Sequence, residues 1–251
     1  MIKIALIGYG KMGKTLESLA PNFDMKVVAK IDPFAEGCAS EITKDTINDC
    51  DVCIEYTSPK TVMDNCRTIA GLGKPIVIGT TGLEAHLDEL KELAVNNNIP
   101  IIYSSNYSVG MNIFFHITKC AAKLFSNLPN YDVSGLEIHH NQKLDSPSGT
   151  AKQLTKILLD NLENKKSEQF DRVDRKIAEE ELHFASIRSG SNMGEHKIFF
   201  DSDADVITLS HNIRSRKGLA EGTLLATKWI VDKKGLFDFQ AEFGEIIGAL
   251  K

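Results

Sequence analysis

Residues 2–13 read IKIALIGYGKMG, a short apolar run that leads directly into a glycine-rich turn. The turn has the spacing G-x-G-x-x-G and consists of Gly8, Tyr9, Gly10, Lys11, Met12 and Gly13. Glycine at these positions permits a tight turn, a close approach of the backbone to a pyrophosphate, and close packing of the next helix on the strand. The N–H groups at the helix start then bind phosphate, assisted by the helix dipole. The stretch predicts the phosphate-binding turn of a Rossmann-type dinucleotide-binding domain.

An acidic residue stands where such a domain recognises ribose. Asp32 ends the second apolar run, about twenty residues beyond the turn, where a carboxylate binds a ribose 2′-hydroxyl. A carboxylate there repels a 2′-phosphate and so favours NADH over NADPH, although Lys11 and Lys30 lie close enough in sequence to weaken the preference. We therefore expect a nicotinamide cofactor, with NADH favoured over NADPH.

The N-terminal part of the chain alternates short apolar runs with amphipathic stretches. The apolar runs, rich in β-branched residues, are 2–8, 26–32, 51–57, 75–81 and 99–105. Helical spacing falls between them at 12–20, 59–72 and 84–97. Strands that are apolar on both faces are typical of a parallel sheet covered by helices, and this alternation predicts right-handed βαβ units. The expected fold class is α/β, with an N-terminal Rossmann-type doubly wound parallel sheet.

The pattern changes after Asn106. The sequence predicts helices at 110–127, 150–162 and 222–234 and strands at 133–140, 195–201 and 205–212. The charged segment 163–176 is expected to be a solvated loop. We interpret this part of the chain as an inserted α+β domain. The expected division is 1–108 plus 217–251 for dinucleotide binding, and 109–216 for the inserted domain.

Composition and charge exclude several classes of protein. A net charge of -5 with 42% hydrophobic residues is ordinary for a globular protein and argues against attraction to nucleic acid or an anionic membrane. No apolar run approaches the ~20 residues that span a bilayer, and the N-terminal run is too short for a signal peptide. We therefore expect a cytoplasmic location. Cys50 and Cys53 form a C-x-x-C, which we interpret as buried apolar structure because no second pair accompanies it.

The densest group of chemically active side chains lies in residues 137–150, EIHHNQKLDSPSGT. Ser146 is expected to cap a helix whose first residue is Pro147. Exposed N–H groups would then form an anion site at Ser148, Gly149 and Thr150. The proton donors beside them are His139, His140 and Lys143. An anion-binding helix start next to titratable donors suits a carboxylate substrate whose reduced centre needs a proton.

This loop resembles the signature loop of the 4-hydroxy-tetrahydrodipicolinate (dihydrodipicolinate) reductases, E-x-H-H-x-x-K-x-D-x-P-S-G-T-A. Similar motifs follow the same order along the chain: VIGTTG at 77–82, SNYSVGMN at 105–112, SIRSG at 186–190 and GEH at 194–196. The resemblance implies a Rossmann domain with a C-terminal substrate and oligomerisation domain, usually in a homotetramer. It also implies reduction of 4-hydroxy-tetrahydrodipicolinate, a small dicarboxylate, to tetrahydrodipicolinate by NADH or NADPH in the diaminopimelate pathway of lysine biosynthesis.

The resemblance also implies roles for individual residues. His139 would be a proton donor or acceptor, and Lys143 the second proton donor. The substrate carboxylates would be held by His140, Ser148, Gly149 and Thr150. The nicotinamide and ribose pocket would be lined by Gly79, Thr80, Thr81, Ser104, Ser105, Asn106 and Tyr107. The inserted domain would close over the cofactor and carry the substrate to it.

The chain departs from the family pattern in two places. Its glycine turn is one residue shorter, with Lys11 where arginine is usual. Near the end, Leu219 stands where phenylalanine is common, while Arg216, which is expected to contact the cofactor, is retained. Neither departure touches the histidine and lysine residues of the loop.

Other side chains and functions stay open. Arg188 and Arg214 would bind a carboxylate, support oligomer contacts or be solvated, whereas His196 and His211 are expected to be hydrogen-bonded structural residues. The histidines lack the ligand spacing of catalytic zinc, so we expect no metal site. Another amino-acid dehydrogenase on this architecture would share the glycine turn without needing the loop. A nicotinamide-sensing regulator would bind the cofactor without turnover.

Overall fold

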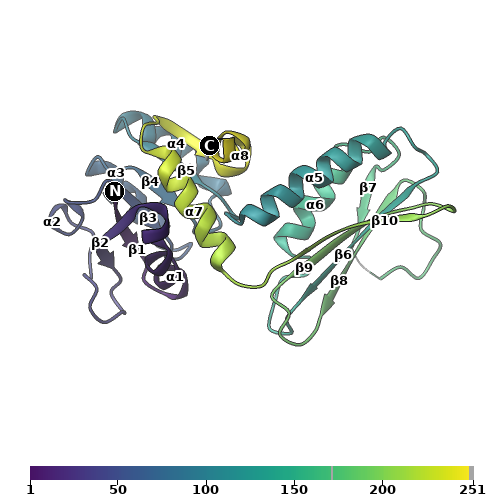
Figure 1. Ribbon diagram of the computed structural model, residues 1–251, viewed down its shortest axis with the longest axis horizontal. Helices are drawn as coiled ribbons and strands as arrows, with labels where there is room; N and C mark the ends of the chain where they lie inside the picture. Colours follow the sequence, from purple (N-terminus) through teal and green to yellow (C-terminus); the bar gives the residue numbers. More distant parts are fainter. Residues whose placement is uncertain (171, 249–251) are drawn as a thin grey trace. The chain divides into compact units, whose positions relative to one another are not determined.

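The computed structural model describes residues 1–170 and 172–248, and the chain forms two compact units (Figure 1). The first unit comprises Met1–Asn112 and Arg216–Lys251, and the second comprises Ile113–Ser215. The second unit is thus an insertion in the first. Among the described residues, no helix combines the length and the apolar character that crossing a membrane requires.

The first unit is built on a sheet of six parallel strands in the order β11-β5-β4-β3-β1-β2. Its strands are β1 (Ile2–Ile7), β2 (Met25–Ile31), β3 (Val52–Glu55), β4 (Ile76–Ile78), β5 (Pro100–Tyr103) and β11 (Gly235–Asp238). Its helices are α1 (Lys11–Leu19), α2 (Lys44–Ile47), α3 (Val62–Gly71), α4 (Leu87–Asn96), α7 (Lys217–Ile230) and α8 (Phe239–Gly248). Short 3-10 turns, η1 (Ala20–Phe23) and η2 (Glu84–His86), adjoin α1 and α4. The predicted α/β class and parallel sheet are confirmed.

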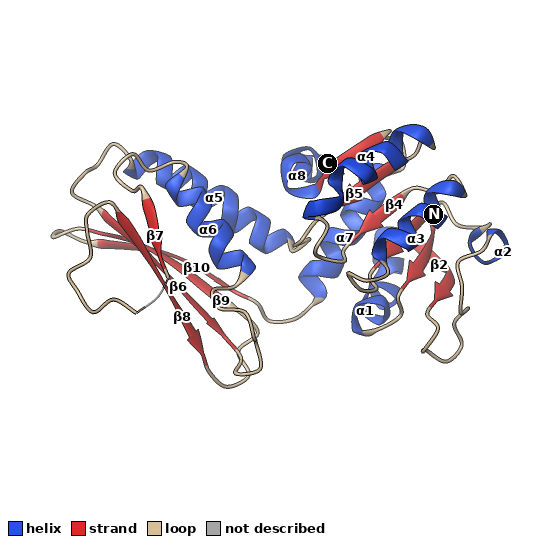
Figure 2. Cartoon of the chain, turned by 180° about the vertical axis from the view of Figure 1, so that it is seen from behind, coloured by secondary structure: helices blue, strands red, loops and turns tan. Residues whose placement is uncertain are grey.

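Helices cover both faces of this sheet, as Figure 2 shows. Alternate residues of β1 enter two separate apolar clusters. Ala5 and Ile7 pack with α3 and α4, whereas Ile4 and Leu6 pack with α1 and α7. Burial on both sides explains the nearly continuous apolar runs of the sequence. Because the strands of this sheet are parallel, their carboxyl ends lie at one edge, where doubly wound sheets bind ligands.

The second unit is built on a mixed sheet of five strands in the order β10-β9-β6-β8-β7. These strands are β6 (Asp132–His139), β7 (Ser167–Gln169), β8 (Glu181–Arg188), β9 (Glu195–Asp201) and β10 (Val206–Asn212). Helix α6 (Gly149–Leu159) packs on β6 and β8, and α5 (Val109–Phe125) stacks its Phe125 on Phe200 of β9. Every second residue of β6 is buried, which is typical of a strand with one covered face. That covered face carries Glu137 and His139.

Several elements differ from their prediction. Helix α7 begins at Lys217, before the predicted 222, and β8, β11 and α8 have no predicted counterpart. The segment 163–176 is not a loop alone, because it contains β7 and the buried Lys165, which pairs with Asp132 at 2.5 Å. Short or charged strands such as β7 depend on their neighbours for stability, and local propensity does not reveal them.

Candidate active site

The glycine turn is shaped by close backbone contacts. Gly8 has a φ of 92°, and a β-carbon on it would lie 2.3 Å from the carbonyl oxygen of Tyr56. A β-carbon on Gly13 would lie 2.6 Å from the carbonyl oxygen of Gly8. Helix α1 starts after Gly10 with no side chain capping it. The N–H groups of its first turn therefore remain for an anion such as a pyrophosphate.

Asp32 is fixed against the glycine turn. Its carboxylate accepts hydrogen bonds from the backbone N–H of Tyr9 at 2.8 Å and of Phe34 at 2.9 Å. Lys30 is already paired, since its Nζ lies 3.3 Å from Oε1 of Glu17 and 4.7 Å from the centre of the Tyr9 ring. The cation that sequence placed nearest to Asp32 is thus partly neutralised.

A cleft of about 650 Å³ opens at the carboxyl ends of β1, β2 and β3. Strand β1 lies between β2 and β3, so the strand order reverses here, as at the ligand site of other doubly wound sheets. The walls include the predicted residues Gly8, Gly10 and Asp32. They also include Tyr56 and Thr57, which we did not predict as site residues although they are the last two residues of the predicted strand 51–57. The cleft and the glycine cradle fit a dinucleotide.

A smaller cavity of about 200 Å³ lies where β4, β5 and β11 end. Three residues predicted for the nicotinamide pocket line it, namely Thr80, Ser104 and Ser105. Asp238, the last residue of β11, and Gln240 in α8 complete its wall and were not predicted.

Two residues predicted for this pocket make close packing contacts. Tyr107 is only 1% exposed, and its hydroxyl donates to the carbonyl oxygens of Ile78 at 3.0 Å and Ile102 at 3.2 Å. Its side chain therefore belongs to the core, which corrects the prediction that it lines the pocket. Gly79 lies against Tyr56, since a β-carbon on it would come within 2.0 Å of the ring.

The other predicted cofactor residues lie nearer the surface. Lys11, Thr81 and Arg216 are exposed, with Arg216 at the N-cap of α7, and Met12 is half-buried. Asn106 accepts a hydrogen bond from the N–H of Ser108 at 2.9 Å.

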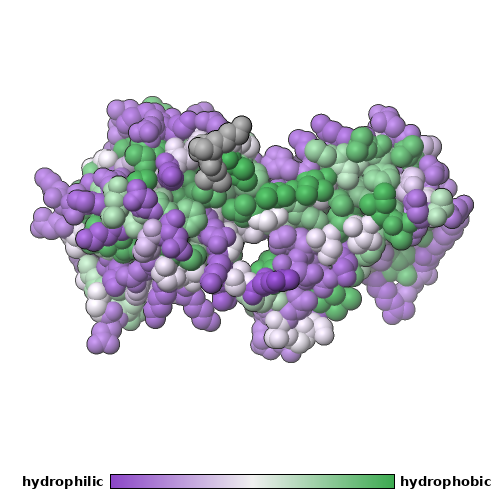
Figure 3. All heavy atoms as spheres, viewed as in Figure 1, coloured by the Kyte–Doolittle hydropathy of each residue, from purple (hydrophilic) through white to green (hydrophobic). Residues whose placement is uncertain are grey.

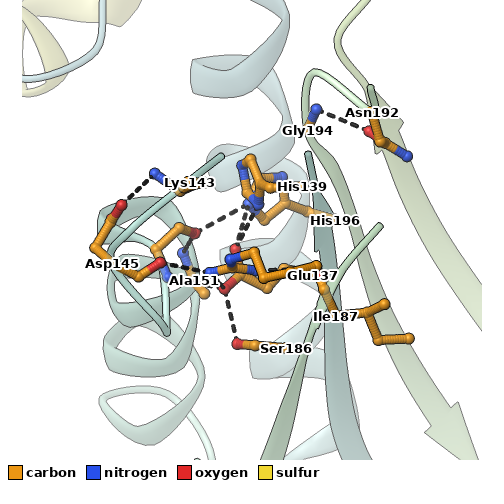
Figure 4. A network of polar contacts seen from close by, with 12 residues as sticks. Glu137, His139, Lys143, Asp145, Ala151, Ser186, Ile187, Asn192, Gly194 and His196 are labelled. Carbon is orange, nitrogen blue, oxygen red and sulfur yellow. Dashed lines mark hydrogen bonds and ion pairs between the residues drawn. The ribbon is translucent and has the colours of Figure 1, made fainter. Parts of the chain in front are cut away.

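The second unit holds a buried pair of functional groups on one strand. His139 is the last residue of β6, and Glu137 stands two positions earlier on the same covered face. Nδ1 of His139 lies 2.8 Å from Oε2 of Glu137 (Figure 4). Burial lowers the pKa of His139, while the charge of Glu137 acts in the opposite direction.

The other carboxylate oxygen of Glu137 accepts three hydrogen bonds from separate parts of the chain. Its Oε1 accepts from the backbone N–H of Ser148 at 2.8 Å, the hydroxyl of Ser186 at 2.7 Å and Nη2 of Arg188 at 3.0 Å. Burial alone would raise the pKa of Glu137, but these hydrogen bonds outweigh it and lower the pKa to about 2. The carboxyl group is therefore ionised. Arg188, whose role was open, binds a carboxylate of the protein itself.

The start of α6 differs in detail from its prediction. The N-cap is Ser148 and not Ser146, because the Ser148 hydroxyl accepts from the N–H of Ala151 at 3.1 Å. The N–H of Ser148 is occupied by Glu137, so the predicted anion site is reduced to Gly149 and Thr150. Their N–H groups precede the first hydrogen bond within the helix and stay available to a carboxylate.

Lys143 lies in the loop between β6 and α6. Its Nζ pairs with Oδ1 of Asp145 at 2.7 Å, and the side chain is 23% exposed. Nη2 of Arg188 donates to the carbonyl oxygen of Asp145 at 2.6 Å. His140 is half-buried, and its carbonyl oxygen accepts from the N–H of Lys143 at 3.1 Å. The same loop thus carries the ammonium group of Lys143 and leads into the start of α6.

His196 on β9 lies next to His139 and Glu137. It is fully buried, and its ring centre is 5.2 Å from that of His139, nearly perpendicular to it. Burial and the neighbouring His139 lower the pKa of His196 to about 4, which keeps it neutral at physiological pH. Ligand atoms of Glu137, His139 and His196 lie within 4.8 Å of one another, a spacing that a cation would accept. Arg188 already pairs with that carboxylate, while Oε2 of Glu137 and Nδ1 of His139 complete no hydrogen bond.

Family models match both parts of the chain. The N-terminal model of dihydrodipicolinate reductase matches residues 2–107, and the C-terminal model matches residues 110–242. The chain belongs to the dihydrodipicolinate reductase family. As a member, it is an NAD(P)H-dependent oxidoreductase.

Individual relatives support the assignment over nearly the full length. A 4-hydroxy-tetrahydrodipicolinate reductase of Christiangramia forsetii is 36% identical over 238 residues, which cover 94% of this chain and 95% of the relative. One from Methanoregula boonei is 32% identical over 244 residues, covering 93% and 94%.

Solved structures share the fold of the dihydrodipicolinate reductase chain. A dipicolinate-bound dihydrodipicolinate reductase from Paenisporosarcina sp. TG-14 superimposes with a TM-score of 0.76 at 23% identity, over 96% of this chain and 99% of that one. An amine dehydrogenase from Mycobacterium smegmatis gives a TM-score of 0.60 at 11% identity, covering 94% of each chain. The fold is therefore shared with a dehydrogenase of a different kind.

Proposed function

We propose that this chain catalyses the reduction of 4-hydroxy-tetrahydrodipicolinate to tetrahydrodipicolinate with NADH or NADPH, in the diaminopimelate pathway of lysine biosynthesis. Family membership over nearly the whole chain carries the proposal. The second unit supports it, because an anion-binding helix start, an ammonium group and a carboxylate-linked histidine meet in one loop. A small dicarboxylate that gains a proton needs these groups.

We assign a role to each residue from the proton or the N–H group that it can offer to the substrate. The reduced nicotinamide supplies the hydride when it is bound. Lys143 holds a proton at Nζ, and His139 exchanges a proton with the substrate at Nε2. His140 and the N–H groups of Gly149 and Thr150 bind the substrate carboxylates, and the Ser148 hydroxyl caps the helix that presents them.

The first unit binds the cofactor in this proposal. The N–H groups after Gly10 receive the pyrophosphate, and Asp32 receives the ribose hydroxyls, while Thr80, Ser104 and Ser105 line the nicotinamide cavity. The ionic character of Asp32 and the pairing of Lys30 with Glu17 favour NADH over NADPH.

A homotetramer is the oligomer that we propose. Large apolar side chains are exposed along α5, including Ile113, Ile117 and Leu124, and Figure 3 shows apolar surface following that helix. Val206 and Ile207 are exposed on β10, an edge strand. Apolar surfaces and open strand edges of this kind are usually covered by a partner. Sedimentation of the purified protein measures the number of subunits.

The activity is tested by the loss of absorbance at 340 nm. Purified protein is mixed with freshly generated 4-hydroxy-tetrahydrodipicolinate, in parallel runs with NADH and NADPH. Rapid oxidation of the cofactor supports the proposal, and the ratio of the two kcat/KM values reports the preference. Binding of both cofactors without any oxidation would refute it.

A further inference from the structure

The neighbours of Glu137 give its two carboxylate oxygens separate tasks. Oε1 faces three donors, from Ser148, Ser186 and Arg188, each within 3.0 Å. Oε2 faces the imidazole of His139 at 2.8 Å and lies 3.9 Å from Nε2 of His196. Figure 4 shows the carboxylate between these groups. Oε2 and Nδ1 are close without completing a hydrogen bond at the present ring angle, and an ionised carboxylate only accepts hydrogen bonds, so the short distance is favourable only when Nδ1 carries a proton.

The far side of the His139 ring is defined by a glycine. Nε2 of His139 would lie 3.1 Å from a β-carbon on Gly194, a residue with a φ of 144°. A side chain at this position would crowd Nε2. With Nδ1 directed to Glu137, Nε2 is the ring nitrogen left for proton exchange.

We propose that Glu137 is a positioning residue that fixes the Nδ1–H tautomer of His139 and so leaves Nε2 as the atom that exchanges a proton with the substrate. This inference rests on the proposed function for its catalytic consequence, but the tautomer itself does not depend on turnover. Arg188 extends the arrangement, because it bonds both Glu137 and the carbonyl oxygen of Asp145, whose side chain holds Lys143. The two proton-bearing groups are thereby tied to one buried carboxylate.

The substitution Glu137→Gln tests whether Glu137 controls the tautomer of His139 or only stabilises the fold. The three donors at Oε1 need an acceptor, so the glutamine carbonyl oxygen takes that side and its NH2 group faces Nδ1 of His139. Nδ1 must then accept, and the ring changes to the Nε2–H tautomer. We expect kcat to fall by about 10²–10⁴-fold, the loss typical of a mispositioned proton-transfer group. Affinity for NADH should be unchanged, because the cofactor residues lie in the first unit.

Long-range ¹H–¹⁵N spectra of the ligand-free protein read the tautomer directly, with His139→Gln used to assign the signals. The parent protein should show a protonated Nδ1 and a bare Nε2 on the alkaline side of the His139 titration, and Glu137→Gln should show the reverse. The control is Glu181→Gln on β8, where the same change removes an ion pair with Arg175 and leaves His139 untouched. It should retain the parent tautomer and the parent kcat.

The outcomes separate the tautomer of His139 from its role in turnover. An Nε2–H tautomer in the parent protein overturns the inference even if the Glu137→Gln variant does not fold. An unchanged tautomer in a folded Glu137→Gln variant also overturns it. A reversed tautomer with full turnover supports the positioning by Glu137 and instead removes His139 from the proposed reaction.

Discussion

The ring of Phe184 lies directly over Gly135, its partner in the parallel pairing of β6 with β8. A β-carbon on Gly135 would approach the ring to within 2.2 Å. Both residues lie on the covered face of the sheet. Gly135 stands two residues before Glu137 on β6, so the two point to the same face. The absence of a side chain at residue 135 thus allows β8 to carry a large aromatic group next to the site.

Gly135→Ala should destabilise the second unit. The added methyl group has no space beside Phe184, and overpacking of a core costs about 1–3 kcal/mol. The free energy of unfolding, measured in urea, should fall by that amount. Gly244→Ala in α8 is the matched control, because a β-carbon there meets nothing within 4 Å and alanine favours a helix. Equal stability of the two variants would contradict the steric argument.

Gly79→Ala should weaken cofactor binding. The Tyr56 ring, within 2.0 Å of the new β-carbon, must move, and Tyr56 is one of the residues that line the larger cleft. We expect the Kd for NADH to rise by about tenfold or more, corresponding to about 1.4 kcal/mol. Titration of NADH fluorescence measures it. A Kd equal to that of the parent would show that Tyr56 is not needed for the cofactor.

Lys143→Ala should depress turnover and leave cofactor binding intact. A positioned proton donor contributes about 10²–10⁴-fold to the rate, so kcat should fall within that range. Lys156→Ala, which removes an exposed lysine paired with Asp160 on α6, provides the control. A normal kcat in Lys143→Ala would exclude Lys143 as a proton donor.

Asp32→Asn should shift the cofactor preference toward NADPH. The amide removes the negative charge that repels a 2′-phosphate, and it can still accept one of the two backbone hydrogen bonds. The ratio of kcat/KM with NADPH to that with NADH should rise by about tenfold, equivalent to about 1.4 kcal/mol. Asp49→Asn, a surface residue paired with Lys3, should leave the ratio unchanged. If both variants keep the parent ratio, the preference is set elsewhere.

His196 should make the second unit sensitive to mild acid. Its folded pKa of about 4 lies below the ordinary value of 6.5, so the unfolded chain binds the proton first as the pH falls. Stability is therefore lost between about pH 6.5 and pH 4, by about 3 kcal/mol in total. His196→Gln should flatten this part of the profile of unfolding free energy against pH, while His86→Gln, at an exposed site, should not. An unaltered slope in His196→Gln would assign the acid sensitivity to other groups.

Glu137 acts in a lower pH range. Its folded pKa of about 2 is below that of an ordinary glutamate, so it contributes stability above pH ~4.5 that is lost as the pH falls toward 2. The profile for the parent protein should therefore decline in two stages, first through His196 and then through Glu137. A variant with Ser186→Ala, which removes one donor to Glu137, should reduce only the second stage.

Local sequence determined the elements whose signals lie within a few residues. The glycine turn, the apolar runs of β1 to β5 and the helical spacing of α1, α3, α4 and α5 follow from backbone sterics and from burial on defined faces. The loop at 137–150 was also recognisable, because its histidines, lysine and helix start are contiguous. The spacing of two between Glu137 and His139 predicts a shared strand face, although our sequence analysis gave Glu137 no role.

Only the tertiary structure decided which distant groups complete the site. Ser186 and Arg188 reach Glu137 because β8 pairs with β6, and His196 reaches His139 because β9 pairs on its other side. The ring of Tyr107 is buried in the core, and the ring of Tyr56 packs against Gly79. Both positions depend on side-chain packing within the first unit. Strand register and side-chain packing join residues far apart in sequence, and no local pattern encodes them. The sequence thus predicted the reacting groups, and the fold determined which partners surround them.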